Sequence, residues 1–210
     1  IVLCASTVFA ADIVYQEPVT RLESAPSFSW SGFSAGIVGG YNWNDLSMRT
    51  SLYPGIEAGT YVDGGLLGGF IGYNHQLNNN WFVGAEADFE GNWAKEKVAV
   101  GTDTLKYGLD WQGSIRARAA FAMDRALIYG TAGWAFSRGY AEIVGVGEVK
   151  ENFNGYTVGA GVDYAFTDKM FGRLEYRYTD FGSKSYTDGV DTFEIDVDQH
   201  AIRVGLGIKF

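Results

Sequence analysis

Charged residues recur at every second position in several stretches of the chain. Glu86, Asp88 and Glu90 form one such run, and Arg116 and Arg118 form another. Side chains two residues apart on a strand point to the same face, so each run predicts a charged strand face. Facing runs of opposite charge can pair as salt bridges, and a run of arginines left over could line a narrow ion pathway.

We expect this charged face to be the inside of a closed sheet. The predicted interior carries six acids and six bases, so its charges balance, which favours a salt-bridged interior; a pore lined by the arginines is the alternative. The residues are Glu86, Asp88, Glu90, Asp110, Asp163 and Glu175 with Arg116, Arg118, Arg173, Arg177, Arg203 and Lys209.

A second candidate site is the acidic segment before the last strand, where carboxylates again alternate along the chain. Carboxylate oxygens are suitable ligands for divalent cations, including those that bridge lipopolysaccharide. A solvated loop with no ligand is the alternative. The candidate ligands are Asp188, Asp191, Glu194, Asp196 and Asp198.

Catalysis is not expected from this sequence. His75 and His200 should lie at opposite ends of the fold, and neither is flanked by a G-x-S-x-G nucleophile motif. We find no metal-ligand spacing, phosphate loop or nucleotide fingerprint, so no cofactor or structural metal is expected. The net charge of −9 argues against a nucleic-acid partner.

The elements that position these side chains are strands, because apolar and polar residues alternate from Trp30 onward. Trp81, Val83 and Phe89, for example, alternate with Gly84 and the Glu86 run. Eight segments show this pattern or fit its spacing: 32–43, 66–75, 81–90, 107–121, 127–137, 156–164, 173–178 and 202–210. The fifth segment is apolar on both faces, so its orientation cannot be assigned.

The predicted connections alternate in length. Short turns at 78–80, 123–126 and 167–169 alternate with long connections at about 44–65, 92–106, 138–154 and 180–199. No apolar run approaches the ~18–20 residues of a membrane helix. The pattern therefore predicts an all-β fold, an eight-stranded antiparallel up-and-down transmembrane β-barrel over 30–210. A soluble β-sandwich is the alternative, but it gives no reason for all long loops to share one end.

The residues before the barrel are expected to be processed. Residues 1–10 (IVLCASTVFA) have the composition of the C-terminal part of a cleaved signal peptide, with Val8 and Ala10 before the cut. Leu3 precedes Cys4, which argues against a lipidation site. Residues 11–29 should form an extended periplasmic segment.

The last strand, HAIRVGLGIKF, ends on Phe210 after apolar residues at alternate positions, with Leu206 and Ile208 before it. Together with WSGFSAGIVGGYNW and TVGAGVDYAFTDKMFGRLEYRYTDFG, it resembles the small outer-membrane β-barrel proteins of alphaproteobacteria, a family that includes surface immunogens, hemin-binding proteins and porin-like proteins. The resemblance covers about residues 30–210.

The resemblance implies a non-enzymatic surface protein in the outer membrane, with both termini in the periplasm. Its implied partners are outer-membrane lipid and lipopolysaccharide, host or environmental ligands, and the barrel-assembly machinery, which would recognise Leu206, Ile208 and Phe210. A narrow porin and a hemin or host-molecule receptor are the alternatives. Loop tyrosines that could ligate hemin are Tyr53, Tyr61 and Tyr186.

Overall fold

The fold consists of β-strands. The computed structural model describes residues 28–50, 57–93, 95–100, 103–143, 147–188 and 191–210. No helix in these ranges is long and apolar enough to cross a membrane. The strands are β1 (Gly32–Thr50), β2 (Glu57–Gln76), β3 (Trp81–Asn92), β4 (Lys95–Val100), β5 (Asp103–Met123), β6 (Ala126–Ile143), β7 (Gly147–Ala165), β8 (Met170–Asp188) and β9 (Asp191–Lys209).

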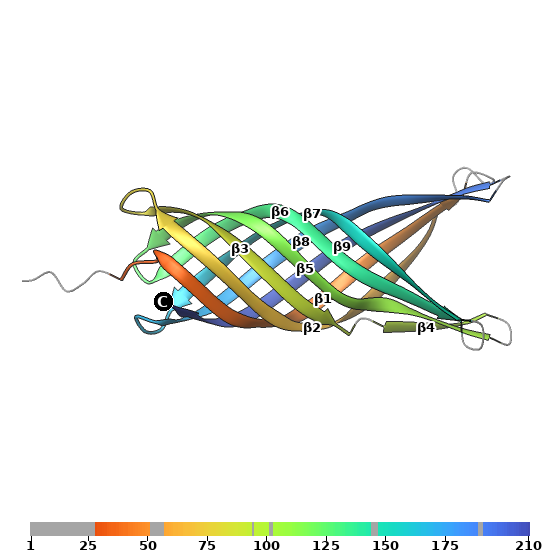
Figure 1. Ribbon diagram of the computed structural model, residues 1–210, viewed down its shortest axis with the longest axis horizontal. Helices are drawn as coiled ribbons and strands as arrows, with labels where there is room; N and C mark the ends of the chain where they lie inside the picture. Colours follow the sequence, from red (N-terminus) through yellow and green to blue (C-terminus); the bar gives the residue numbers. More distant parts are fainter. Residues whose placement is uncertain (1–27, 51–56, 94, 101–102, 144–146, 189–190) are drawn as a thin grey trace, which may run out of the picture.

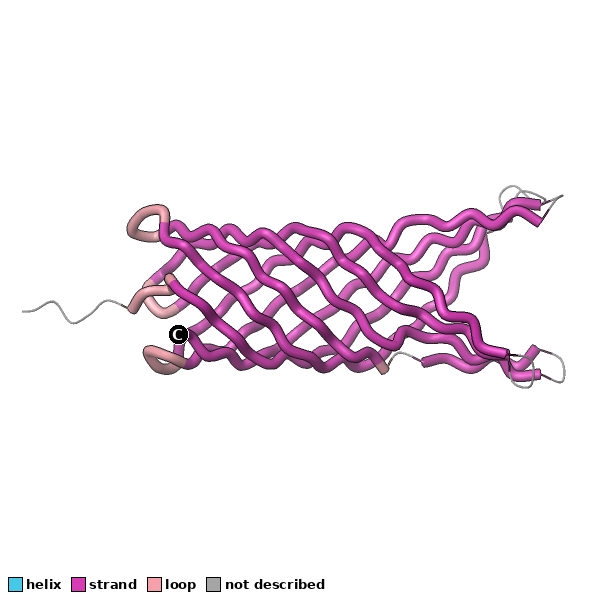
Figure 2. The backbone as a smooth tube through the Cα atoms, viewed as in Figure 1, coloured by secondary structure: helices cyan, strands magenta, loops and turns pink. Residues whose placement is uncertain are grey.

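The strands close into a barrel (Figures 1 and 2). Every pairing is antiparallel, β1 pairs with both β2 and β9, and β3 pairs with β5. The short strand β4 also pairs with β5, beyond the end of β3, so β3 and β4 together occupy one position in the ring. The barrel is therefore eight-stranded, and the predicted fold class is confirmed.

Apolar residues cover the outside of the barrel and alternate with inward side chains, as predicted. Ile37, Ile71 and Ile115 are each more than 60% exposed, as a surface solvated by lipid requires. In β6, whose orientation the sequence left open, Leu127 is fully buried whereas Ile128 is 49% exposed, so its odd-numbered residues face inward. Closure leaves no strand edge unpaired within the ring.

The two ends of the barrel differ. We call the end with the short β2–β3, β5–β6 and β7–β8 turns the turn end, and the opposite end the loop end. The C-terminus also lies at the turn end (Figure 1). At the loop end the strands extend much further than predicted: β1 runs to Thr50 and β9 begins at Asp191, inside segments predicted as long connections. The prediction was wrong because backbone pairing continues past the predicted strand ends, for example between Leu46 and Val197 and between Met48 and Ile195.

The predicted alternation over 107–121 is confirmed from Gln112 onward but is wrong at Asp110. The β5–β6 register shifts between Leu109 and Trp111, which leaves Asp110 as the extra residue of a β-bulge. A bulge changes which side of the sheet the following residues face. Asp110 therefore stands outside the regular inward row formed by Gln112, Ser114 and the residues after them.

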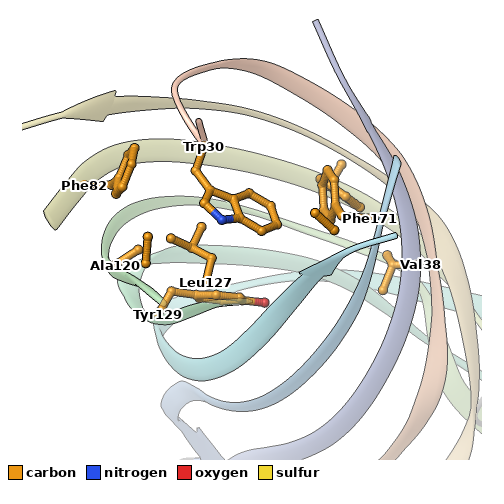
Figure 3. Close-up of a cluster of buried hydrophobic side chains, with 10 residues drawn as sticks. Trp30, Val38, Phe82, Ala120, Leu127, Tyr129 and Phe171 are labelled. Atoms are coloured by element: carbon orange, nitrogen blue, oxygen red, sulfur yellow. The ribbon is translucent and has the colours of Figure 1, made fainter. Parts of the chain in front are cut away.

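The turn end is filled by apolar side chains that we call the apolar plug: Trp30, Phe70, Phe82, Leu127 and Phe171 (Figure 3). Trp30 precedes β1, yet its side chain is only 3% exposed and its ring lies 5.7 Å from that of Phe171. Phe28 packs edge-on against Trp30, with ring centroids 4.9 Å apart. The segment before the first strand therefore helps to close this end.

Candidate functional site

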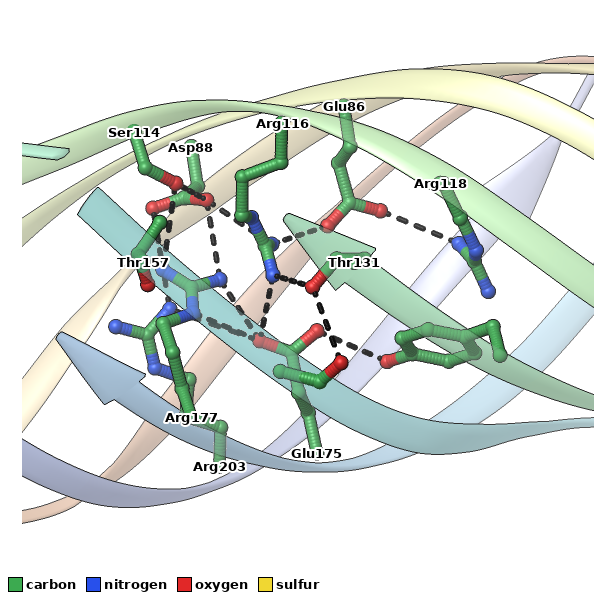
Figure 4. A network of polar contacts seen from close by, with 12 residues as sticks. Glu86, Asp88, Ser114, Arg116, Arg118, Thr131, Thr157, Glu175, Arg177 and Arg203 are labelled. Atoms are coloured by element: carbon green, nitrogen blue, oxygen red, sulfur yellow. Dashed lines mark hydrogen bonds and ion pairs between the residues drawn. The ribbon is translucent and has the colours of Figure 1, made fainter. Parts of the chain in front are cut away.

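Ten charged side chains fill the middle of the barrel, and we call them the ionic network. Figure 4 shows part of it, with Arg116 between Glu86 and Glu175. Every one is at most 7% exposed. The network consists of the five acids Glu86, Asp88, Glu90, Asp163 and Glu175 and the five bases Arg116, Arg118, Arg173, Arg177 and Arg203. Its formal charge therefore sums to zero.

Arg116 lies at the centre of the ionic network. Its guanidinium group donates to Glu86 at 2.6 Å, to Asp88 at 3.1 Å and to Glu175 at 3.1 Å. Glu86 and Asp88 lie on β3, whereas Glu175 lies on β8, so these contacts cross the interior. Arg116 also donates to the hydroxyl of Thr131 on β6 at 2.9 Å. One side chain from β5 thus connects three other strands.

The part of the network nearest the turn end contacts the apolar plug. Arg173 binds Asp163 through two nitrogens, at 2.9 and 3.1 Å, and Glu86 at 2.8 Å. Its guanidinium carbon lies 4.0 Å from the centre of the Phe70 ring. Arg118 pairs with the same two carboxylates and lies 3.7 Å from the ring centre of Tyr129. Charged and apolar layers therefore meet without an empty layer between them.

Towards the loop end, the network passes into uncharged polar side chains. Arg177 binds Asp88 at 2.9 Å and Glu175 at 2.8 Å, and Arg203 lies 2.6 Å from Glu90. Beyond them the amide of Gln112 donates to Glu90 at 2.9 Å. This layer also includes buried Asn42, Asn44, Asn92, Thr157, Thr179 and Gln199.

This arrangement is suited to closing the barrel. An eight-stranded barrel has an interior just wide enough for side chains, and a buried ion is costly unless a counter-ion compensates it. Each of the ten charged groups has at least one opposite charge within 4.0 Å. The side chains that would line a pore are therefore held by one another.

Two of the predicted interior charges lie outside the network. Asp110, at the bulge, forms no ion pair within the described part of the chain, because it is displaced from the inward row. Lys209 lies at the turn end, where its ammonium donates to the backbone carbonyl of Ser29 and lies 5.0 Å from the ring centre of Phe28. Because one predicted acid and one predicted base lie outside the network, its remaining five acids and five bases still balance.

Tyr129 was missed by the sequence analysis. Its hydroxyl donates to Glu175 at 3.0 Å, and its ring packs against Arg118. It was missed because its strand is apolar on both faces. The signal that could have identified it is Gly161 on the neighbouring strand: a Cβ there would come within 2.5 Å of the tyrosine oxygen. Glycine is therefore required to accommodate the inward ring.

Most of the predicted acidic cation site lies outside the described part of the structure. The side chains of Asp188, Asp191, Glu194 and Asp196 are not among those described. Asp198 is described, and it accepts a hydrogen bond from the Tyr178 hydroxyl at 2.6 Å. Among the described residues, no group of three or more candidate metal-ligating side chains lies together.

The candidate hemin ligands are tyrosines of the predicted long connections. Tyr53 and the side chains of Tyr61 and Tyr186 lie outside the described residues. Of the histidines, His200 contacts the Tyr176 hydroxyl at 2.7 Å through Nδ1, and His75 is exposed near the turn end. Neither histidine faces the interior network.

The predicted assembly signal lies on the outer face of β9 at the turn end. Leu206, Ile208 and Phe210 are 52%, 48% and 77% exposed. The predicted signal peptide and most of the predicted lead-in segment, residues 1–27, lie outside the described part of the chain.

The known proteins that this chain resembles are outer-membrane proteins. Residues 3–210 match the family model described as outer membrane protein beta-barrel domain. The chain is 35% identical to the 25 kDa outer-membrane immunogenic protein of Brucella abortus, over 98% of this chain and 92% of that one. It is 38% identical to the 22 kDa outer membrane protein of Rhizobium leguminosarum, over 88% and 80%. The outer membrane protein OprG of Pseudomonas aeruginosa has the same fold, with 14% identity, a TM-score of 0.52 and coverage of 86% and 96%.

Proposed function

Since the chain belongs to the family of outer-membrane β-barrel proteins, we propose that it is a closed, non-conducting barrel. In this proposal the barrel anchors a structured surface in the bacterial envelope, and its role is structural and interactive, not enzymatic. Its relatives are named as an outer-membrane immunogenic protein and an outer membrane protein. The alternatives are a narrow porin and a receptor for hemin or a host molecule.

The observation that carries the proposal is the ionic network. Arg116, Arg177 and Arg203 extend from β5, β8 and β9 to carboxylates on β3, so charged side chains occupy the width of the interior. A water-filled pore would need these groups to be hydrated, whereas they are buried and paired. The apolar plug adds a second, dry barrier nearer the turn end.

We further propose that the turn end faces the periplasm and the loop end faces outward. Outer-membrane barrels have short periplasmic turns and longer external connections. In this orientation Leu206, Ile208 and Phe210 lie at the periplasmic end, where the barrel-assembly machinery would recognise them. The aromatic residues Tyr41, Trp43 and Tyr176 are exposed on the outer face of the barrel, which faces lipid in this proposal.

The experiment is single-channel recording of the refolded protein in a planar lipid bilayer. Folding is first established by heat-modifiable gel mobility, so that a silent bilayer cannot be attributed to unfolded protein. A folded protein that gives no current supports the closed barrel. Reproducible ohmic steps that change in Arg116→Ala or Arg173→Ala would overturn it and favour the porin. Hemin binding that disappears with deletion of a loop, in a folded barrel, would favour the receptor.

A further inference from the structure

The loop end of the barrel divides into two separate sheets. The β7–β8 ladder stops at the pair Tyr156–Asp180, and the β2–β3 ladder stops at Leu66–Asn92. The other ladders continue outward, for example to Asp188–Asp191 between β8 and β9. Figures 1 and 2 show the result as two groups of strands that diverge at the loop end.

The two groups differ in charge. We call the group formed by β1, β2, β8 and β9 over 41–50, 57–65, 180–188 and 191–200 the acidic lobe. It carries nine acids and two bases: Asp45, Glu57, Asp63, Asp180, Asp188, Asp191, Glu194, Asp196 and Asp198 against Arg49 and Lys184. The second lobe, formed by β4–β7 over 95–100, 103–110, 138–143 and 147–155, carries six acids and five bases. Most of the net charge of −9 therefore lies on one lobe.

The β8 edge of the acidic lobe begins beside a bulge. The β8–β9 register shifts between Asp180 and Ser183, and Gly182 adopts a positive φ of 71° that glycine tolerates. The amide of Gly182 donates to the Asp180 carboxylate at 2.7 Å, which stabilises this turn of the backbone. Bulges bend the strand that contains them. Beyond this point, in the described residues, β8 pairs with β9 alone.

We propose that this edge of β8, at residues 183–188, binds an extended, basic peptide segment of another protein as an added strand. Unpaired N–H and C=O groups on a strand edge are a template for β-augmentation. The edge strand itself carries one acid, Asp188, and one base, Lys184, but β9 beside it carries Asp191, Glu194, Asp196 and Asp198 with no lysine or arginine over 191–200, which favours a cationic partner through charge complementarity. A second copy of this chain is disfavoured, because two acidic lobes would repel each other. This peptide binding rests on the proposed surface-interaction role, in which the acidic lobe faces outward from the membrane.

The test uses the full refolded barrel in zwitterionic nanodiscs. The probe is a fluorescent ten-residue peptide of alternating lysine and threonine, and binding is followed by anisotropy. We expect saturable binding that weakens as salt rises. The double variant Glu194→Gln/Asp196→Asn should lower the affinity roughly fivefold, since each exposed ion pair contributes at most about 1 kcal/mol. The matched control, Glu148→Gln/Glu151→Gln on the second lobe, removes the same charge and should change the affinity less than about twofold.

Strand addition is separated from simple charge attraction by a second peptide of the same sequence, methylated on its backbone nitrogens. It retains every positive charge but cannot donate to a strand edge, so we expect its affinity to fall by about tenfold or more. Equal binding of the two peptides, or equal loss in the two double variants, would overturn the proposal. The result is distinguishable from failure of the closed-barrel proposal, because conductance is measured in the absence of peptide.

Discussion

The apolar plug and the ionic network fill neighbouring layers of the same barrel by different physical means. The plug excludes water through the size of its rings, and Trp30 reaches it from outside the strands. The network excludes an open path because its charged groups pair with one another across the interior. The two layers meet where Arg173 lies over the Phe70 ring.

The difference lies in what each layer tolerates. An apolar layer that loses a side chain leaves a cavity, and neighbouring rings can partly relax into it. A network that loses one charge leaves its buried partners uncompensated, which costs more than the net value of the original pair. We therefore expect charge substitutions to be the more damaging, even though the ionic network contributes little net stability over an apolar interior of the same shape.

The largest effect is expected for Arg116→Met. The substitution leaves Glu86, Asp88 and Glu175 short of a positive charge, and we expect a loss of about 3–5 kcal/mol in the free energy of unfolding. Urea titration of the barrel in lipid vesicles, followed by tryptophan fluorescence, measures it. Arg116→Lys keeps the charge and should lose less. A loss below about 1 kcal/mol for Arg116→Met would contradict the claim that its buried carboxylate partners need this positive charge.

A smaller effect is expected in the apolar plug. Trp30→Ala removes a ring packed against Phe171 and should cost about 3 kcal/mol in the same titration. Trp30→Phe retains part of the packing and serves as the control. If Trp30→Ala lowered the free energy of unfolding more than Arg116→Met, the apolar plug and not the ionic network would be the more sensitive layer.

The position of Tyr129 beside the ionic network is tested by Gly161→Ala. A Cβ at this position would meet the Tyr129 oxygen at 2.5 Å and the Leu174 carbonyl at 2.6 Å, so we expect a loss of about 2 kcal/mol. Gly130→Ala is the matched control, because its Cβ would lie 3.9 Å from its nearest neighbour, the Gly159 carbonyl oxygen. Equal effects of the two substitutions would show that Tyr129 is not held against Gly161.

The smallest effect is expected for an exposed ion pair at the turn end. Arg125 lies 3.1 Å from Asp168, but the two side chains are 40% and 83% exposed. Water screens such a pair, so Arg125→Ala should change the free energy of unfolding by less than about 1 kcal/mol. A loss comparable to that of Arg116→Met would mean that burial is not what distinguishes the interior charges.

The sequence predicted the alternating strands well because lipid imposes a clear pattern on them. Each side chain in the membrane faces either lipid or the interior, so Glu86 and Phe89 could be assigned to opposite faces from their types. The same contrast identified all ten residues of the ionic network. It did not exclude Asp110, because nothing in the residue types marks the bulge that displaces it.

The prediction was less accurate at the loop end of the barrel. Residues 44–50 and 191–199 continue β1 and β9, and Leu46 and Met48 pair there with Val197 and Ile195. These segments were predicted as long connections because charged residues are frequent in them. Trp30 was missed for a different reason. It precedes the first strand, so no periodicity indicates that the chain turns its side chain into the barrel.

The central claim is that the ionic network closes the barrel even without the apolar plug. Single-channel recording of folded Trp30→Ala tests it most directly, because this variant removes the largest ring of the plug while leaving every charge pair in place. We predict a bilayer that remains silent over the voltage range in which the membrane is stable. Ohmic steps from Trp30→Ala, with none from the unsubstituted protein, would contradict the claim and would show that the plug alone forms the seal.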